Sequence, residues 1–345
     1  MRRRRPERTL RILLLSDPDF LPPDTLEGHT EEEIYKWKTE FDVITTLREI
    51  GHEVRPLGVE DELAPIRVAI ADWKPHIVFN LIEQFHGQRS FDHHVPSFLE
   101  LMKVCYTGCN PRGLVLAKDK ALAKKLLTYH RIRTPGFLVF PKGRRPVRLR
   151  GFDFPVIVKS LSEESSIGIS QASIVDSMEK LIERVRFVHD SVGTDAIVEQ
   201  FIEGRELYVA IIGNKRLRVL PTWELVFEKM AAGSAAIATE RVKHDVRYQQ
   251  KHEIEDRPAK DLPAAVAASI VRTSKRIFKI LELDGYARID YRLSPGGELY
   301  FLEANPNPEI AEREEFARAA HADGTSYADL LQAIVDLGLR RKRWQ

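Results

Sequence analysis

Apolar positions recur with two different periods along the first eighty residues of the chain. Runs typical of strands occur three times: 11–15, 53–57 and 76–81. Between them, apolar residues at helical spacing predict two helices: 34–50, which Gly51 ends, and 66–73. Strands that alternate with helices predict an open, parallel α/β sheet, in which ligands bind at the carboxyl ends of the strands.

A second pattern, near the carboxyl end of the chain, predicts a β-hairpin. Two runs rich in β-branched, aromatic and aliphatic residues, 286–293 and 298–305, flank a Ser-Pro-Gly-Gly turn. Period-two alternation puts three polar residues on one face of the first strand: Arg288, Asp290 and Arg292. On the second strand it groups Phe301, Glu303 and Asn305 on one face, and Tyr300 and Leu302 on the other.

The polar residues of this hairpin have the chemistry of a metal site. If the register lays Asp290 beside Glu303, two carboxylates and the amide oxygen of Asn305 converge, and such hard oxygen ligands suit Mg²⁺. A solvated polar face is the alternative. It accounts poorly for Pro306 and Pro308, which end the strand rigidly after Asn305.

Three further features predict contact with phosphate groups. The apolar run 154–158 ends at Lys159, a costly place for a charge unless an anion meets it. Residues 160–169 are rich in serine and contain Gly168, so that backbone N–H groups can approach phosphates closely. Residues 117–120 are predicted to begin a helix whose Lys120 reaches phosphates, with a solvated helix lysine as the alternative.

Together these segments resemble the ATP-grasp ligases, and most closely their D-alanine–D-alanine ligase branch. The resemblance rests on Arg288-Ile-Asp290, on the spacing from Asp290 to Glu303-Ala-Asn305, and on the segments 106–120, 154–169 and 196–206. It implies an ATP-grasp fold, mixed α/β and α+β. It also implies an ATP-dependent enzyme that joins a carboxylate to an amine through an acylphosphate.

The resemblance implies three structural parts. Residues 1–112 would form the N-terminal α/β substrate domain, 113–204 a central ATP-grasp subdomain with the phosphate lid, and 205–345 a C-terminal subdomain with the metal hairpin. The sequence also predicts a meander of strands over 207–225 and helices over 263–283 and 327–337. Four residues are the candidates for the buried face of the first of these helices: Ala265, Ala268, Val271 and Ile277.

The resemblance also implies roles for individual residues. The expected contacts to ATP are Lys120, Lys159, Ser165, Gly168, Glu199, Gln200, Phe201, Ile202 and Glu206. Backbone groups of Gln200 and Ile202 would pair with the adenine edge, and Glu206 would accept from the ribose hydroxyls.

Catalysis by these residues would rest on positioned cations, because the transferring phosphoryl group carries negative charge. The expected metal ligands are Asp290, Glu303 and Asn305, holding two Mg²⁺ ions, with Mn²⁺ as a possible substitute. The expected catalytic residues are Arg288, Ser166 and Lys243, of which Arg288 stabilises the oxyanion. For the contact to the γ-phosphate, Lys229 and Arg241 remain alternatives to Lys243, which we prefer because 226–238 resembles an insertion.

Two segments depart from the D-alanine–D-alanine ligase pattern, and both are expected to contact substrate. The loop after the third strand carries Glu83, and the segment after Asn305 carries Glu309 and several more acids, where the family has hydroxyl and glycine turns. The acids after Asn305 would repel an ordinary amino-acid carboxylate and favour a substrate with an exposed amine or a basic side chain. The departure after the third strand argues against D-alanine as the substrate. The alternative is that the acids of 312–315 only stabilise the first turn of the next helix.

Composition limits the remaining functions. A chain of 345 residues exceeds one hydrophobic core, and a net charge of +2 gives no general attraction to nucleic acid. The basic runs 2–5 and 340–343 are typical of solvated tails. Cys105 and Cys109 cannot build a disulfide framework, and no apolar run reaches about 18 residues, so we expect a cytoplasmic protein without a membrane partner. The resemblance adds a homodimer acting on small molecules.

Three other functions remain open. An ATP-grasp enzyme could pass its acylphosphate to an acceptor other than an amine. A regulatory module could bind ATP without turnover, although the joint presence of Lys159, Arg288, Asp290, Glu303 and Asn305 argues against it. Binding of nucleic acid through the terminal arginines would show a steep dependence on salt.

Overall fold

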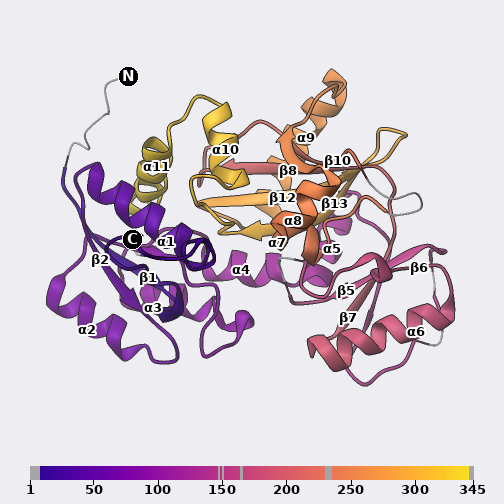
Figure 1. Cartoon of the computed structure of the whole chain (residues 1–345), viewed down its shortest axis with the longest axis horizontal. Coiled ribbons are helices and arrows are strands. Elements are labelled where there is room, and N and C mark those ends of the chain that lie inside the picture. The colour runs from indigo at the N-terminus through magenta and orange to yellow at the C-terminus, as the bar shows by residue number, and fades with distance from the viewer. Residues whose placement is uncertain (1–7, 147, 150, 164–165, 230–234, 342–345) are drawn as a thin grey trace.

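The computed structural model of the chain describes residues 8–146, 148–149, 151–163, 166–229 and 235–341. Three β-sheets carry the described part of the fold. In Figure 1 the first sheet lies at the left, the second at the lower right, and the third above and between them. Helices α4 (Pro111–Lys118) and α5 (Lys120–Tyr129) lead from the first sheet to the other two.

The first sheet is parallel, as the sequence predicts. It consists of β1 (Arg11–Ser16), β2 (Glu53–Gly58) and β3 (Ile77–Asn80) in the order β2-β1-β3. The helices of this region are α1 (Glu31–Glu49), α2 (Ala64–Trp73) and α3 (His94–Leu101). The C-terminal helix α11 (Tyr327–Leu339) packs on α1 and β3, so the end of the chain returns to the first sheet.

The second sheet is antiparallel and small. Its strands are β4 (Phe137–Phe140), β7 (Ala196–Gln200), β5 (Val156–Ser160) and β6 (Ile174–Val175), in that spatial order. Helix α6 (Met178–Phe187) packs on it and closes a separate hydrophobic core.

The third sheet contains the predicted hairpin at its edge. Along the order β11-β10-β8-β12-β13, its strands are β11 (Ile254–Pro258), β10 (Trp223–Phe227), β8 (Arg205–Ile212), β12 (Tyr286–Leu293) and β13 (Leu299–Pro306), with β9 (Arg218–Val219) beside β8. The helices of this region are α7 (Glu240–His244), α8 (Val246–His252), α9 (Ala264–Ile280) and α10 (Glu315–Ala322). One face of β8 and β12 packs on α4, α5 and α9, which leaves the charged face of the hairpin for a site.

Three expectations about these elements are wrong. Residues 117–120 do not begin one helix, because Lys118 ends α4 and Lys120 begins α5. Ala265, Ala268 and Val271 of α9 are exposed. The buried stripe of this helix is set by its larger residues: Ile270, Ile277 and Phe278, together with Ser274, which bonds to the Tyr291 hydroxyl.

The third error concerns the basic residues at the end of the chain. Arg341 is buried, its guanidinium lies over the Tyr106 ring, and it forms an ion pair with Asp284. This residue therefore anchors α11 instead of belonging to a solvated tail; the run 2–5 lies outside the described residues. Within the described ranges no helix is long and apolar enough to cross a bilayer.

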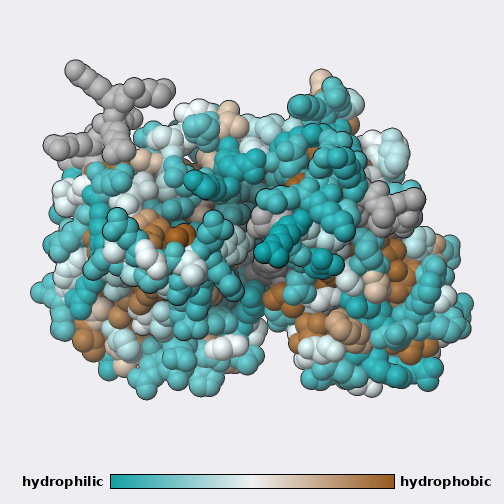
Figure 2. Space-filling view, in the orientation of Figure 1, coloured by the Kyte–Doolittle hydropathy of each residue, from teal (hydrophilic) through white to brown (hydrophobic). Residues whose placement is uncertain are grey.

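The mixed helix and sheet architecture agrees with the predicted fold class, whereas the domain limits at 112 and 204 stay a prediction. Most of the surface in view is hydrophilic, and it is indented between the left half and the lower-right lobe (Figure 2).

Candidate active site

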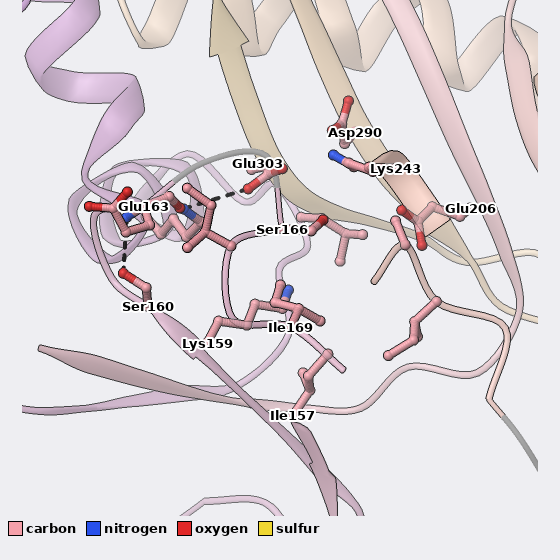
Figure 3. A pocket seen from close by; sticks show the side chains of 15 residues that line it. Ile157, Lys159, Ser160, Glu163, Ser166, Ile169, Glu206, Lys243, Asp290 and Glu303 are labelled. Atoms are coloured by element: carbon pink, nitrogen blue, oxygen red, sulfur yellow. Dashed lines mark hydrogen bonds and ion pairs between the residues drawn. The ribbon is translucent and has the colours of Figure 1, made fainter. Parts of the chain in front are cut away.

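A pocket lies between the second and third sheets, where β5 faces the hairpin of β12 and β13 (Figure 3). The cavity is narrow: its volume is about 50 Å³, which is below the usual range of sites for small ligands. Its charged lining residues are Lys120, Lys159, Glu163, Glu206, Lys243, Asp290 and Glu303. Its apolar lining residues are Ile157, Ile167, Ile169, Ile237, Ala238 and Leu302. Apolar walls beside charged groups suit a ligand with a flat ring and an anionic end.

Around Asp290 the hairpin has the register that the sequence predicts. Asp290 pairs with Glu303 across the two strands, and Arg288 pairs with Asn305. The Asn305 amide donates to the Asp290 carboxylate at 3.0 Å. Two carboxylates and one amide therefore meet on the charged face of the third sheet.

A β-bulge changes the alternation just beyond this point. The register shifts between Asp290 and Tyr291, so that Tyr291 pairs with Phe301 and Leu302 has no partner across the hairpin. Phe301 is consequently buried in the core on the opposite face from Glu303, and the prediction that these two residues share a face is wrong. Leu302, expected on the other face, lines the pocket.

Arg288 is held by two carboxylates. Its Nε and Nη2 donate to the two oxygens of Asp290 at 2.8 and 3.0 Å, and its Nη1 donates to Glu315 at 3.1 Å. Burial opposes its charge, but these acids raise the pKa of Arg288 well above its ordinary value. In this arrangement Arg288 orients Asp290, and its role at an oxyanion stays a prediction.

The lysines around Glu303 make this carboxylate a stable anion. Burial alone would raise its pKa, but Lys120, Lys243 and Lys159 outweigh burial and lower the pKa of Glu303 to about 2. The Lys120 ammonium lies 3.8 Å from Glu303 and donates to the Glu163 carbonyl. The positive charge needed by phosphate groups is thus concentrated beside Asp290 and Glu303, the carboxylates that are predicted to bind metal.

Lys159 shares its partner with a lysine that sequence reasoning missed. The Lys159 ammonium donates to Glu199 Oε2 at 3.0 Å, and the Lys124 ammonium lies 3.0 Å from Glu199 Oε1. Burial would raise the pKa of Glu199, but the two lysines lower it to about 2. The predicted adenine-side residue Glu199 therefore points to Lys124 and Lys159. In the sequence, Lys124 has no feature that separates it from a solvated helix lysine.

Of the residues predicted to bind the adenine and the ribose, one lines the pocket and the others do not. Glu206 lines the pocket, where its carboxylate accepts from Arg292 at 2.7 Å and from the Tyr208 hydroxyl at 3.0 Å. The described residues that line the pocket do not include Glu199, Gln200, Phe201 or Ile202. The Gln200 N–H donates to the Gly136 carbonyl, and the Phe201 N–H donates to the Pro155 carbonyl. The contacts of this segment to adenine stay a prediction.

The predicted phosphate lid, residues 160–169, reaches the pocket in part. Ser166 lines the pocket and has a positive φ of 60°. Gly168 does not line the pocket. Its N–H donates to Glu240 and its carbonyl accepts from Arg184. Ser165 lies outside the described residues. The lid is thus held against the start of α7, which closes this side of the pocket.

Geometry separates the three candidates for the γ-phosphate. Lys243 lines the pocket. Lys229 forms an ion pair with Glu253, and Arg241 pairs with Asp245 and stacks on Tyr248. Of the three cations only Lys243 is placed to act in the pocket, and its contact with phosphate stays a prediction.

The acids of the two divergent segments meet near the carboxyl ends of β1 and β3. Lys38 of α1 pairs with Glu309 at 2.8 Å and with Glu314, which precedes α10. Glu40, on the same helix, is 5% exposed and accepts from the Ser16 hydroxyl at 2.7 Å.

Burial, aided by the charges of Glu83 and Glu309, raises the pKa of Glu40 to about 7, against the Ser16 hydrogen bond. Of these acids, sequence analysis identified Glu83 and Glu309 and missed Glu40. Glu315 lies in the first turn of α10, as the helix-end alternative expects, but its carboxylate also binds Arg288.

The donor groups of the pocket fit Mg²⁺ and ATP. Within the described ranges no group of three or more His, Cys, Asp or Glu side chains could hold a metal ion. Mg²⁺ is commonly held by one or two carboxylates together with substrate phosphates, and Asp290 and Glu303, beside the Asn305 amide, supply such a partial set. Lys120, Lys159 and Lys243 would meet the phosphates.

Comparison with known proteins gives consistent results. The family model described as D-ala D-ala ligase C-terminus matches residues 145–336. The chain is 30% identical over 310 residues to the uncharacterized protein y4sG of Sinorhizobium fredii, covering 87% of each chain. It is 30% identical over 307 residues to the D-alanine–D-alanine ligase of Desulforudis audaxviator, covering 87% of this chain and 92% of that one.

Among solved structures, the D-alanine–D-alanine ligase of Bacillus anthracis complexed with ATP superposes with a TM-score of 0.72, at 22% identity. The match covers 96% of this chain and 98% of that one. At this level of identity the likeness supports the same fold.

Proposed function

The chain belongs to the D-alanine–D-alanine ligase family and is an ATP-dependent ligase that forms carbon–nitrogen bonds, and we propose that the pocket between β5 and the β12–β13 hairpin is its active site. One observation carries the proposal. Lys120, Lys159 and Lys243 come from three separate elements and converge with Asp290 and Glu303 on one pocket.

Each group in the pocket has a role in this proposal. Bound Mg-ATP supplies the phosphoryl group that turns a carboxylate into a reactive acylphosphate. The three lysines stabilise the negative charge that develops on the transferring group. Asp290, Glu303 and Asn305 would hold Mg²⁺, with two ions as our proposal. Arg288 keeps Asp290 in position and is proposed to stabilise the oxyanion when the amine attacks.

The remaining contacts to ATP are proposals of the same kind. Ser165, Ser166 and Gly168 would contribute the lid over the phosphates. The segment 199–202 would bind the base, and Glu206 the ribose. The sequence does not predict a nucleophile of the Ser-His-Asp or Cys-His type. Catalysis would therefore depend on the position and charge of the groups alone.

The substrates are small molecules, and we propose a pair other than two D-alanine molecules. Glu83 and Glu309 belong to the segments that depart from the family pattern, and Glu40 lies beside them at the carboxyl ends of the first sheet. Several carboxylates with Lys38 as a cation partner favour a substrate that carries an amine or a basic side chain. That the chain forms a homodimer, and that it is located in the cytoplasm, stay predictions.

The test is phosphate release from Mg-ATP with a panel of amino acids and dipeptides, singly and in pairs, followed by mass spectrometry of the products. We expect release that depends on a pair in which one member carries a basic side chain or a second amine, with a product mass equal to both substrates minus water. Lys159→Met should abolish it, and Lys180→Met, which changes an exposed lysine of α6, should not. Turnover with D-alanine alone that exceeds every other combination would refute the proposed substrate class.

A further inference from the structure

Lys124, in α5, is a completely buried lysine that has no assigned role. Its side chain is 0% exposed. Burial lowers the pKa of Lys124, against the attraction of Glu199. A buried ammonium is costly unless its surroundings satisfy it, so the contacts of Lys124 show what this charge supports.

The contacts of Lys124 belong to both halves of the pocket. The ammonium lies 3.0 Å from Glu199 in β7 of the second sheet, and the same carboxylate binds Lys159. It also donates to the carbonyl of Leu302 in β13 of the third sheet. Leu302 is the bulge residue and is followed directly by Glu303. One ammonium therefore joins the carboxylate that holds Lys159 to the backbone that presents Glu303.

We propose that Lys124 is a positioning residue that couples the nucleotide side of the site to its metal side. Lys124 takes one oxygen of Glu199, so Lys159 is held by the other and keeps its place in the pocket. Lys124 also fixes the Leu302 carbonyl and with it the bulge that turns Glu303 toward the lysines. The inference rests on the proposed function, because it assumes that this pocket binds Mg-ATP.

Loss of the ammonium should affect both sides together. Without Lys124, Glu199 keeps Lys159 as its remaining cation partner among the contacts described here, and draws that lysine toward β7. The Leu302 carbonyl loses its donor, and Glu303 is less well oriented. The factor by which Mg²⁺ tightens nucleotide binding measures the coupling between the two sides of the site. This factor should therefore decrease when Lys124 no longer joins them. A purely structural lysine would change stability and leave this factor unaltered.

The experiment measures the affinity of a non-hydrolysable ATP analogue by titration calorimetry, with and without Mg²⁺, on the full chain. For Lys124→Met we expect the ratio of the two affinities to fall at least about tenfold relative to wild type. Lys125→Met, which changes the adjacent exposed lysine, is the matched control and should keep the wild-type ratio. If Lys124→Met does not fold, Lys124→Gln retains an N–H donor at a neutral side chain and should reduce the ratio in the same direction.

The outcomes separate this inference from the proposed function. Wild-type protein that does not bind the analogue would overturn the proposed nucleotide site itself. Wild-type coupling together with an unchanged ratio in a folded Lys124 variant, even if both affinities weaken equally, would overturn the coupling role and leave the site standing.

Discussion

Glu40 offers a quantitative test of the electrostatics at the carboxyl end of β1 in the first sheet. The folded protein raises the pKa of Glu40 from 4.5 to about 7, chiefly by burial. Each unit is worth about 1.4 kcal/mol, so the full effect is about 3 kcal/mol. The folded state binds this proton more tightly than the unfolded state does. The contribution of Glu40 to the free energy of unfolding is therefore fully present at low pH and is lost as the pH rises from about 4.5 to about 7.

The perturbation is Glu40→Gln, which keeps a group that can accept from Ser16 but cannot ionise. Wild type should lose about 2.5 kcal/mol more than the variant between pH 5 and pH 8. Subtracting the pH dependence of the variant's unfolding free energy from that of wild type removes the effect of other groups that titrate in this range. The remaining difference includes the influence of the charged residues near Glu40: Glu83, Glu309 and Lys38.

The assay is urea unfolding followed by circular dichroism at both pH values. Glu32→Gln, at an exposed position of the same helix, is the control and should behave as wild type does. If Glu40→Gln loses stability with pH in parallel with wild type, to within about 0.5 kcal/mol, Glu40 does not titrate as its burial requires.

The remaining predictions concern the pocket and the connection between β7 and β8. Glu303→Gln should lower turnover at least about 100-fold in a protein that still folds, as measured by phosphate release and circular dichroism; retained turnover would remove Glu303 from the metal site. Arg292→Met should destabilise the protein by about 3 kcal/mol in urea, because it leaves Glu206 buried without its ion pair, and a loss below about 1 kcal/mol would argue against that. Gly204→Ala should cost about 2 kcal/mol or more in the same assay, because its φ is +134° and the added Cβ meets the Leu293 carbonyl; an equally stable variant would contradict the strain.

The pairing of the hairpin strands around Asp290 could be predicted because local signals fix it. The turn and the period-two alternation place Asp290 beside Glu303, and the structure has this pair. The bulge at Leu302 could not be predicted, since it depends on a distant segment: the Phe301 N–H donates to the Arg133 carbonyl, and the Phe301 ring enters the core.

Buried charges were missed for a related reason. Lys124 and Glu40 lie on helices, where charged residues are usually solvated, and their burial depends on partners far away in the sequence. The face of α9 was assigned wrongly because alanines give a weak amphipathic signal, while Ile277 was assigned correctly. Local patterns thus predicted the main elements, and the family resemblance named the charged residues that line the pocket except Glu163, whereas tertiary contacts decided which charges are buried.

The central claim is that this pocket uses ATP to activate a carboxylate for attack by an amine. The most direct test labels the carboxylate substrate found in the panel with ¹⁸O and measures the label in the released phosphate. Activation as an acylphosphate predicts one ¹⁸O atom transferred to phosphate for each amide formed, and no transfer with Glu303→Gln. Amide product accompanied by unlabelled phosphate would contradict the account.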